Sequence, residues 1–177
     1  LILLPLFPSG EPIVLKKHPI LKKPLFIGLG LALFQQLTGI NGIIFFAPTL
    51  LYKTGVHDQG SLLLLTASIG IVNSLTTLLC IGLIDRVGRR PLLIFSLSGM
   101  ALSLLFLTLI SSTLLTLVGL IGYIFFFAIG IGPLFWVVCS ELFAKGGGMG
   151  LATLVNWMAN FLVSSTFLLL VDWVDLP

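Results

Sequence analysis

Charge is what this sequence has least of. Charged residues make up 8% of its 177 residues, whereas an ordinary soluble domain carries about 25%. Hydrophobic residues make up 58%, and the mean hydropathy is +1.20. So few charges cannot cover a chain of this size in water, which excludes soluble enzymes, disordered regions and nucleic-acid-binding modules. The composition predicts a protein that crosses a membrane several times.

Cysteine and the side chains of catalytic sites are also scarce. Cys80 and Cys139, the two cysteines, lie in or beside apolar stretches, so we expect small buried thiols rather than a disulfide. The apolar stretches contain no pair of carboxylates, no Ser–His arrangement and no metal-ligand spacing. The two histidines, His18 and His57, lie in separate loops. The sequence therefore predicts neither an enzyme, nor a cofactor, nor a metal site.

Five apolar stretches are long enough to cross a membrane as helices, which requires about 20 residues each. They cover residues 25–51, 61–84, 91–110, 114–140 and 149–171. The predicted fold class is all-α, a polytopic bundle of about five transmembrane helices over residues 25–177. Residues 1–24 form a polar, proline- and lysine-containing segment that we expect at the membrane surface. Gly39, Gly42 and Pro48 in the first stretch, and the run Gly-Ile-Gly-Pro from Gly130 in the fourth, predict weakened or bent helices.

The basic residues fall in alternate loops. If five helices alternate in direction, segments 11–24, 85–90 and 144–148 share one side and hold eight of the nine basic residues. Lys53 stands alone on the other side. The positive-inside bias of short loops then predicts that the N-terminal segment and the basic loops are cytoplasmic. We expect a multi-pass protein of the plasma membrane, with an organelle membrane as the alternative.

Carboxamides and indoles are the polar groups that the apolar stretches contain. The candidate ligand-binding residues are Gln35, Gln36, Asn41, Asn73, Trp136, Asn156 and Trp157. Polar groups in a membrane often mark a wet cavity, and the alternative is hydrogen bonding between helices. Amides exchange hydrogen bonds with hydroxyls in both directions, and an indole packs against the C–H face of a sugar ring. Because neither acids nor arginines lie mid-membrane for a charged ligand, the pattern favours a neutral polyhydroxylated ligand.

Asn156 and Asn160 share one helix face because they are four residues apart. We expect that face to meet the amides of the first stretch.

The most ordered charge pattern lies in the loop after the second stretch. It contains Asp85, Arg86, Arg89 and Arg90, and Glu141 ends the fourth stretch at the same depth. A contact between an arginine and Glu141 would latch one state of a rocking carrier. The alternative is a plain positive-inside loop.

Four sequence strings follow one another in the order typical of one transporter family. They are Gln-Gln-Leu-Thr-Gly-Ile-Asn from Gln35, the loop 85–90, Gly-Pro-Leu-Phe-Trp ending at Trp136, and Asn-Trp-Met-Ala-Asn from Asn156. From Lys16 to its end, the chain resembles the sugar porter family of the major facilitator superfamily, specifically helices seven to eleven of its C-terminal half. The resemblance implies transport of a monosaccharide (hexose, pentose or polyol) by alternating access, as a facilitator or a proton symporter. It also implies a missing N-terminal half of six helices.

The resemblance also implies roles for single residues. Gln35, Gln36, Asn41 and Asn73 match positions that hydrogen-bond sugar hydroxyls, Trp136 matches the indole below the ring, and Asn156 and Trp157 lie near the same cavity. Asp85, Arg86, Arg89, Arg90 and Glu141 match the cytoplasmic charge network. The stretch after Glu141 departs from the family because it is shorter and lacks an arginine, which leaves Lys145 as a weak substitute. The shortened stretch leaves an inactive truncated copy as one alternative. A non-transporting sugar receptor on the same fold is the other alternative.

Overall fold

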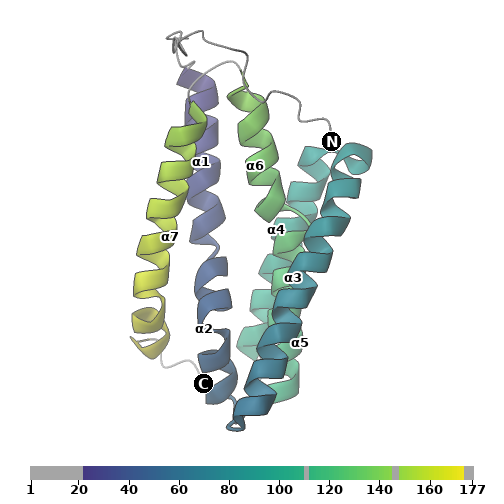
Figure 1. Cartoon of the computed structure of the whole chain (residues 1–177), viewed down its shortest axis with the longest axis vertical. Coiled ribbons are helices and arrows are strands. Elements are labelled where there is room, and N and C mark those ends of the chain that lie inside the picture. Colours follow the sequence, from purple (N-terminus) through teal and green to yellow (C-terminus); the bar gives the residue numbers. More distant parts are fainter. Residues whose placement is uncertain (1–21, 110–111, 145–147, 174–177) are drawn as a thin grey trace, which may run out of the picture.

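Seven helices make up the regular structure of the described residues, which are 22–109, 112–144 and 148–173 of a computed structural model. Figure 1 shows them packed as a bundle with roughly parallel axes. In chain order they are α1 (Lys22–Leu37), α2 (Ile40–Lys53), α3 (Gln59–Val87), α4 (Arg89–Leu109), α5 (Thr113–Ala128), α6 (Ile131–Leu142) and α7 (Gly148–Trp173). The predicted all-α class is confirmed. Most of the predicted surface segment 1–24 lies outside the described residues.

Two of the five predicted helices are broken where glycine and proline predict it. The first stretch forms α1 and α2, which meet at Gly39 with φ at 77°, a conformation that residues with a Cβ rarely adopt. The fourth stretch forms α5 and α6, which meet at Gly130. Pro133 follows the second break and has no N–H to donate to the carbonyl of Ile129. Pro48, in contrast, lies inside α2 without ending it.

Within the part of the chain that the structure describes, four helical stretches are long and apolar enough to cross a membrane. They are Lys22–Lys53, Gln59–Val87, Arg89–Leu109 and Thr113–Leu142, so each broken helix counts as one span. α7, the fifth predicted span, forms a helix of 26 residues but is not among the four.

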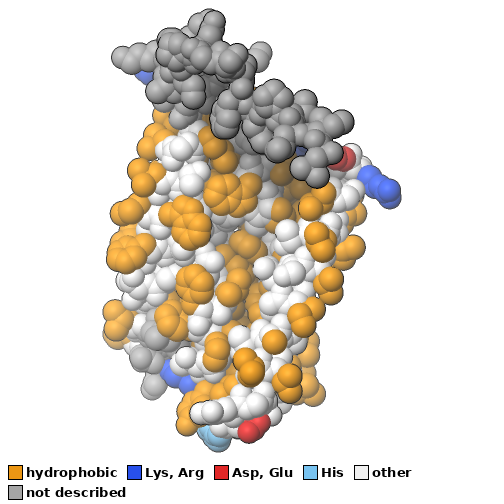
Figure 2. All heavy atoms as spheres, in the orientation of Figure 1, with side chains coloured by type: hydrophobic (Ala, Val, Ile, Leu, Met, Phe, Trp, Pro, Cys, Tyr) orange, Lys and Arg blue, Asp and Glu red, His pale blue; other side chains and the backbone are white. Residues whose placement is uncertain are grey.

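If α1–α2 and α5–α6 are each counted as one broken helix, successive helices alternate in direction, so the helix ends fall at two ends of the bundle. The start of α1, the α3–α4 junction, the end of α6 and the start of α7 share one end, and the α2–α3 loop lies at the other (Figure 1). The predicted alternation of loops is therefore present, although Lys145 and residues 1–21 lie outside the described residues. On the face seen in Figure 2, apolar side chains cover the flank and charged groups lie near its two ends.

The core is apolar and joins all seven helices. One cluster gathers Ile40, Leu51, Tyr123 and Ile124 with residues of α3, α4 and α6, and a second joins α1, α6 and α7 around Phe135. Both cysteines are buried and free, as the sequence predicts.

Candidate functional site

The break between α1 and α2 carries a cluster of four amide side chains, here called the amide cluster: Gln35, Gln36, Asn41 and Asn156. Asn41 Nδ2 donates to Gln36 Oε1 at 2.7 Å, and Gln36 Nε2 donates to Asn156 Oδ1 at 2.9 Å. Asn156 Nδ2 donates to Gln35 Oε1 at 2.6 Å and to the carbonyl of Ala32 at 3.2 Å. The structure thus brings together four of the seven candidate binding residues, from α1, α2 and α7.

Gln35 also connects the amide cluster to the second broken helix. Its Nε2 donates to the carbonyls of Gly132 at 2.9 Å and Ile131 at 3.3 Å, both in the first turn of α6. Gln35, Gln36 and Asn156 are buried, with Asn156 only 1% exposed. The amides therefore hydrogen-bond helix to helix, the alternative that the sequence left open, while they lie at the two breaks.

The members of the cluster differ in the hydrogen bonds they have left to make. Each amide has two N–H donors and one carbonyl acceptor. Gln35 and Asn156 use both donors within the protein. Gln36 and Asn41 each use one, and Asn41 Oδ1 accepts no hydrogen bond from a described residue. Asn41 is also half-buried, so Asn41 and Gln36 are the members with capacity for a ligand.

The other candidate residues lie apart from this network. Asn73 is half-buried on α3, and its side-chain amide makes no hydrogen bond within the described part of the chain. Trp136 on α6 is 39% exposed and packs edge-to-face on Phe135 with ring centroids 4.7 Å apart. Trp157 is 58% exposed on α7. These side chains have free surface for a ligand or a neighbouring helix.

Asn160 does not do what its spacing predicts. Its Oδ1 accepts a hydrogen bond from Ser164 Oγ at 3.1 Å within α7, whereas Asn156 alone reaches the amides of α1. Asn160 is also buried, at 7% exposed, but it lies about 6 Å further along the helix axis than Asn156 and hydrogen-bonds within α7 instead of with the amides of α1.

The sequence analysis missed three residues that hydrogen-bond at the helix breaks, and two of them stabilise the α5–α6 break. Ser96 Oγ on α4 donates to the carbonyl of Phe126 at 2.7 Å and accepts from the backbone N–H of Ile131 at 3.1 Å. Cys80 Sγ lies 3.1 Å from the carbonyl of Ile129, the group that Pro133 leaves without its helical donor. The signal available in the sequence was the break itself, because freed backbone groups inside a membrane require polar partners.

Tyr123 is the third missed residue. Its hydroxyl donates to the carbonyl of Thr38, at the α1–α2 break.

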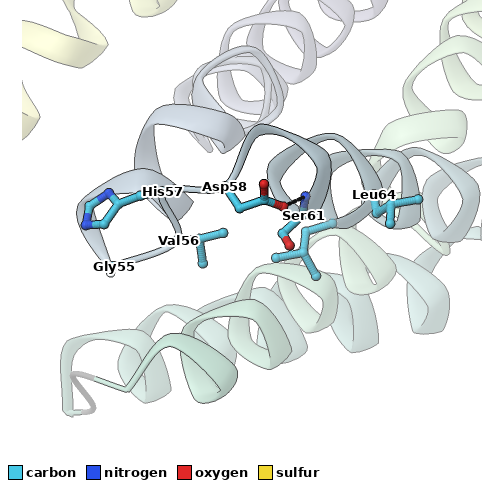
Figure 3. Close-up of a pocket in the computed structure, with 7 residues that line it drawn as sticks. Gly55, Val56, His57, Asp58, Ser61 and Leu64 are labelled. Atoms are coloured by element: carbon cyan, nitrogen blue, oxygen red, sulfur yellow. Dashed lines mark hydrogen bonds between the residues drawn. The ribbon is translucent and has the colours of Figure 1, made fainter.

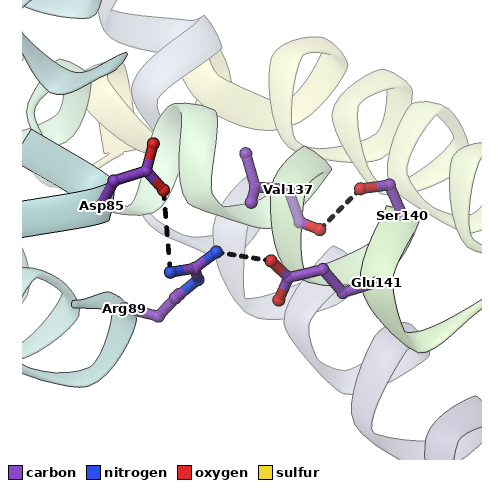
Figure 4. Close-up of polar contacts among 5 residues, drawn as sticks. All are labelled: Asp85, Arg89, Val137, Ser140 and Glu141. Atoms are coloured by element: carbon purple, nitrogen blue, oxygen red, sulfur yellow. Dashed lines mark hydrogen bonds and ion pairs between the residues drawn. The ribbon is translucent and has the colours of Figure 1, made fainter. Parts of the chain in front are cut away.

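Charged side chains meet at the end of the molecule that carries the predicted basic loops. Arg89 Nη2 lies 2.7 Å from Glu141 Oε1, and Arg89 Nη1 lies 3.9 Å from Asp85 Oδ1 (Figure 4). Arg89 and Glu141 are partly exposed, whereas the side chain of Asp85 is 84% exposed. Arg86 and Arg90 are exposed and pair with no acid among the described residues. Three of the five predicted network residues therefore come together, and they link α3, α4 and α6.

A pocket lies at the opposite end, in the α2–α3 loop, and contains none of the candidate binding residues. Gly55, His57, Asp58 and Leu64 are among the residues that line it (Figure 3). Asp58 caps α3 by accepting from the N–H of Ser61 at 2.7 Å, and this hydrogen bond lowers the pKa of the carboxyl. Among the described residues, no group of histidine, cysteine, aspartate and glutamate is arranged to hold a metal ion.

Comparison of the chain with known proteins identifies its family. The family model described as "Sugar (and other) transporter" matches residues 11–175. The chain is 35% identical over 170 residues to the glucose transport protein of Synechocystis, covering 86% of this chain and 36% of the relative. It is 38% identical over 150 residues to the glucose facilitated diffusion protein of Zymomonas mobilis, covering 81% and 32%.

A solved structure shows the same fold. The proton:xylose symporter XylE, a major facilitator protein bound to 6-bromo-6-deoxy-D-glucose, superposes with a TM-score of 0.76 at 33% identity, over 86% of this chain and 33% of that one. The chain thus spans about a third of the length of the proteins it matches. The chain belongs to the sugar transporter family of the major facilitator superfamily, a family of transporters rather than enzymes.

Proposed function

We propose that the protein containing this chain carries a monosaccharide across a membrane by alternating access, and that this chain supplies one side of the sugar site. The amide cluster supports the proposal most strongly, because it places uncharged hydrogen-bonding groups at two helix breaks inside the bundle. Broken helices near the midplane are where transporters of this general architecture bind substrates. The names of the relatives point to glucose and xylose as the class of substrate.

The hydrogen-bond inventory divides the candidate residues into two groups. Asn41, Gln36 and Asn73 retain donors or acceptors that sugar hydroxyls use in both directions. Gln35 and Asn156 are buried and fully engaged, so we infer that they hold Gln36 and Asn41 in place. The partly exposed indole of Trp136 offers a flat apolar surface for the face of the ring.

The Asp85–Arg89–Glu141 network is proposed to latch one state of the carrier. Its three members belong to α3, α4 and α6, so a rigid-body movement that separates these helix ends breaks the ion pairs. The basic end is proposed to be cytoplasmic, in the plasma membrane. The remaining two thirds of the relatives' length would supply the other side of the cavity as six further helices.

The carrier is proposed to work either by facilitated diffusion or by proton symport. The relatives include a facilitated diffusion protein and a proton symporter. The acids described in α3 and α6, Asp85 and Glu141, lie at helix ends away from the amide cluster. Asp58 caps α3 in the loop at the opposite end of the bundle, so we expect a symporter to use an acid from another part of the protein. Sugar uptake driven by an imposed proton gradient distinguishes the two mechanisms.

Counterflow of radiolabelled hexose tests the proposed function, using the full-length protein in proteoliposomes. The wild-type protein is expected to exchange hexose, and Asn41→Ala and Trp136→Ala are each expected to raise the KM about tenfold. Trp173→Ala, at the exposed end of α7, is the matched control and should leave the KM unchanged. Hexose binding without counterflow would indicate the receptor alternative, and neither activity would indicate an inactive copy.

A further inference from the structure

The carbonyl of Thr38 stands at the point where α1 stops and α2 has not yet begun. At this break Gly39 N–H donates to the carbonyl of Gln36, and Thr38 Oγ1 donates to the carbonyl of Gln35 at 2.6 Å. No backbone N–H of the described residues donates to the Thr38 carbonyl. Its hydrogen-bond donor is the hydroxyl of Tyr123 on α5.

Tyr123 is built into the core at this point. Its side chain is 0% exposed and belongs to the apolar cluster that includes Ile40, the first residue of α2. A carbonyl left without a donor in an apolar, membrane-spanning bundle is costly. The ring of Tyr123 packs in the apolar core. Its hydroxyl hydrogen-bonds to the backbone at the break.

This break determines the geometry of the amide cluster. Gln36 lies in the last turn of α1 and Asn41 in the first turn of α2, and their side chains hydrogen-bond across the break at 2.7 Å. Thr38 lies between them in the chain. Fixing its carbonyl therefore fixes the angle at which α2 presents Asn41 to Gln36.

A second contact runs in the opposite direction between the same two broken helices. Gln35 of α1 donates to the carbonyls of Ile131 and Gly132 in α6, whereas Tyr123 of α5 donates to the α1–α2 break. Each broken helix thus donates a side-chain hydrogen bond to backbone carbonyls of the other. Gln35 lies in the last turn of α1 and Thr38 at the break itself, so the two contacts together tie the end of α1 and the break to the second broken helix.

We propose that Tyr123 is a positioning residue of the sugar site: its hydroxyl holds the α1–α2 break so that Gln36 and Asn41 present their unused hydrogen-bonding groups together. It acts through the backbone of Thr38 and does not contact the sugar. This inference rests on the proposed function, and it adds a residue that the family strings quoted above do not contain.

Tyr123→Phe removes the hydroxyl and keeps the ring. In full-length protein in proteoliposomes, the variant is expected to raise the KM for hexose about 3- to 10-fold, the effect of one misplaced hydrogen bond, while Vmax per folded protein stays near the wild-type value. Tyr52→Phe is the matched control, because Tyr52 is 52% exposed at the far end of α2. Tyr123→4-aminophenylalanine restores a donor and should return the KM toward the wild-type value.

A double-mutant cycle separates positioning from general stability. If Tyr123 acts through Asn41, Tyr123→Phe has little further effect on the KM in an Asn41→Ala background. An unchanged KM in Tyr123→Phe, or fully additive effects in the double variant, overturns the inference and leaves sugar transport by the wild-type protein intact. Absence of hexose counterflow by the wild-type protein overturns the proposed function itself, and the inference with it.

Discussion

Asn156 is the residue on which the amide cluster depends most. It accepts from Gln36, donates to Gln35 and to the backbone of Ala32, and is 1% exposed. Asn156→Ala leaves these partners buried without it, so we expect the free energy of unfolding to fall by about 1–2 kcal/mol. Thermal unfolding of the purified protein in detergent measures the loss. Asn160→Ala, which removes one acceptor used within α7, should cost less, and an equal loss would show that Asn156 does not organise the cluster.

Ser96 is expected to have a similar structural role at the other break. Its hydroxyl donates to the carbonyl of Phe126 and accepts from the N–H of Ile131, two backbone groups at the break. Ser96→Ala should lower the free energy of unfolding by about 1–3 kcal/mol. Ser103→Ala is the matched control, because Ser103 is buried on the same helix and makes no hydrogen bond to a described residue. Equal stability of the two variants would contradict this account of the break.

At the scale of the element, the α1–α2 break depends on the backbone of Gly39. Its φ of 77° is a conformation that costs an alanine roughly 1 kcal/mol. Gly39→Ala should therefore lower the melting temperature and raise the KM for hexose, because the break carries the amide cluster. Gly30→Ala tests the same change within α1, where an added Cβ meets nothing within 4 Å, and should be neutral or stabilising. If Gly39→Ala has the melting temperature and KM of the wild type, the break does not depend on the backbone conformation of Gly39.

The start of α3 provides a pH-dependent test outside the membrane spans. The N–H of Ser61 holds the pKa of the Asp58 carboxyl below its ordinary value, so the ionised cap stabilises the helix end above the unfolded-state pKa. That stabilisation is lost as the pH falls through the lowered, folded-state pKa. Hydrogen exchange at Ser61, corrected for the intrinsic rate, should show protection that falls on acidification. In Asp58→Asn, whose cap does not titrate, protection should not change with pH, and a parallel fall there would contradict the role of Asp58.

The helices and their breaks follow from local sequence, whereas their partners do not. Gly39 and the run from Gly130 to Pro133 act on their own backbone, so the sequence predicts both breaks correctly. Ser96 and Tyr123 become partners of those breaks only because α4 and α5 pack beside them. Such packing depends on the rotation of each helix and on its position along the bundle, which also decide that Asn156 and not Asn160 hydrogen-bonds to the amides of α1.

At the scale of the whole molecule, polarity is segregated along the bundle. The flanks are apolar, the amides lie at the two breaks, and Asp85, Arg89 and Glu141 meet at one end. This arrangement agrees with the proposed transport of an uncharged solute, because the breaks offer hydrogen bonds without fixed charge and the ion pairs lie at helix ends. The exposed part of Trp136 and the amide of Asn73 have no hydrogen-bond partner among the described residues.

Equilibrium binding of D-glucose and D-xylose to the purified full-length protein tests the central claim most directly. Isothermal titration should show binding by the wild-type protein and a Kd at least about tenfold higher in Gln36→Ala. Gln59→Ala removes an exposed amide at the far end of the bundle and should bind as the wild type does. Equal Kd values for the wild type and Gln36→Ala would contradict a sugar site at the amide cluster.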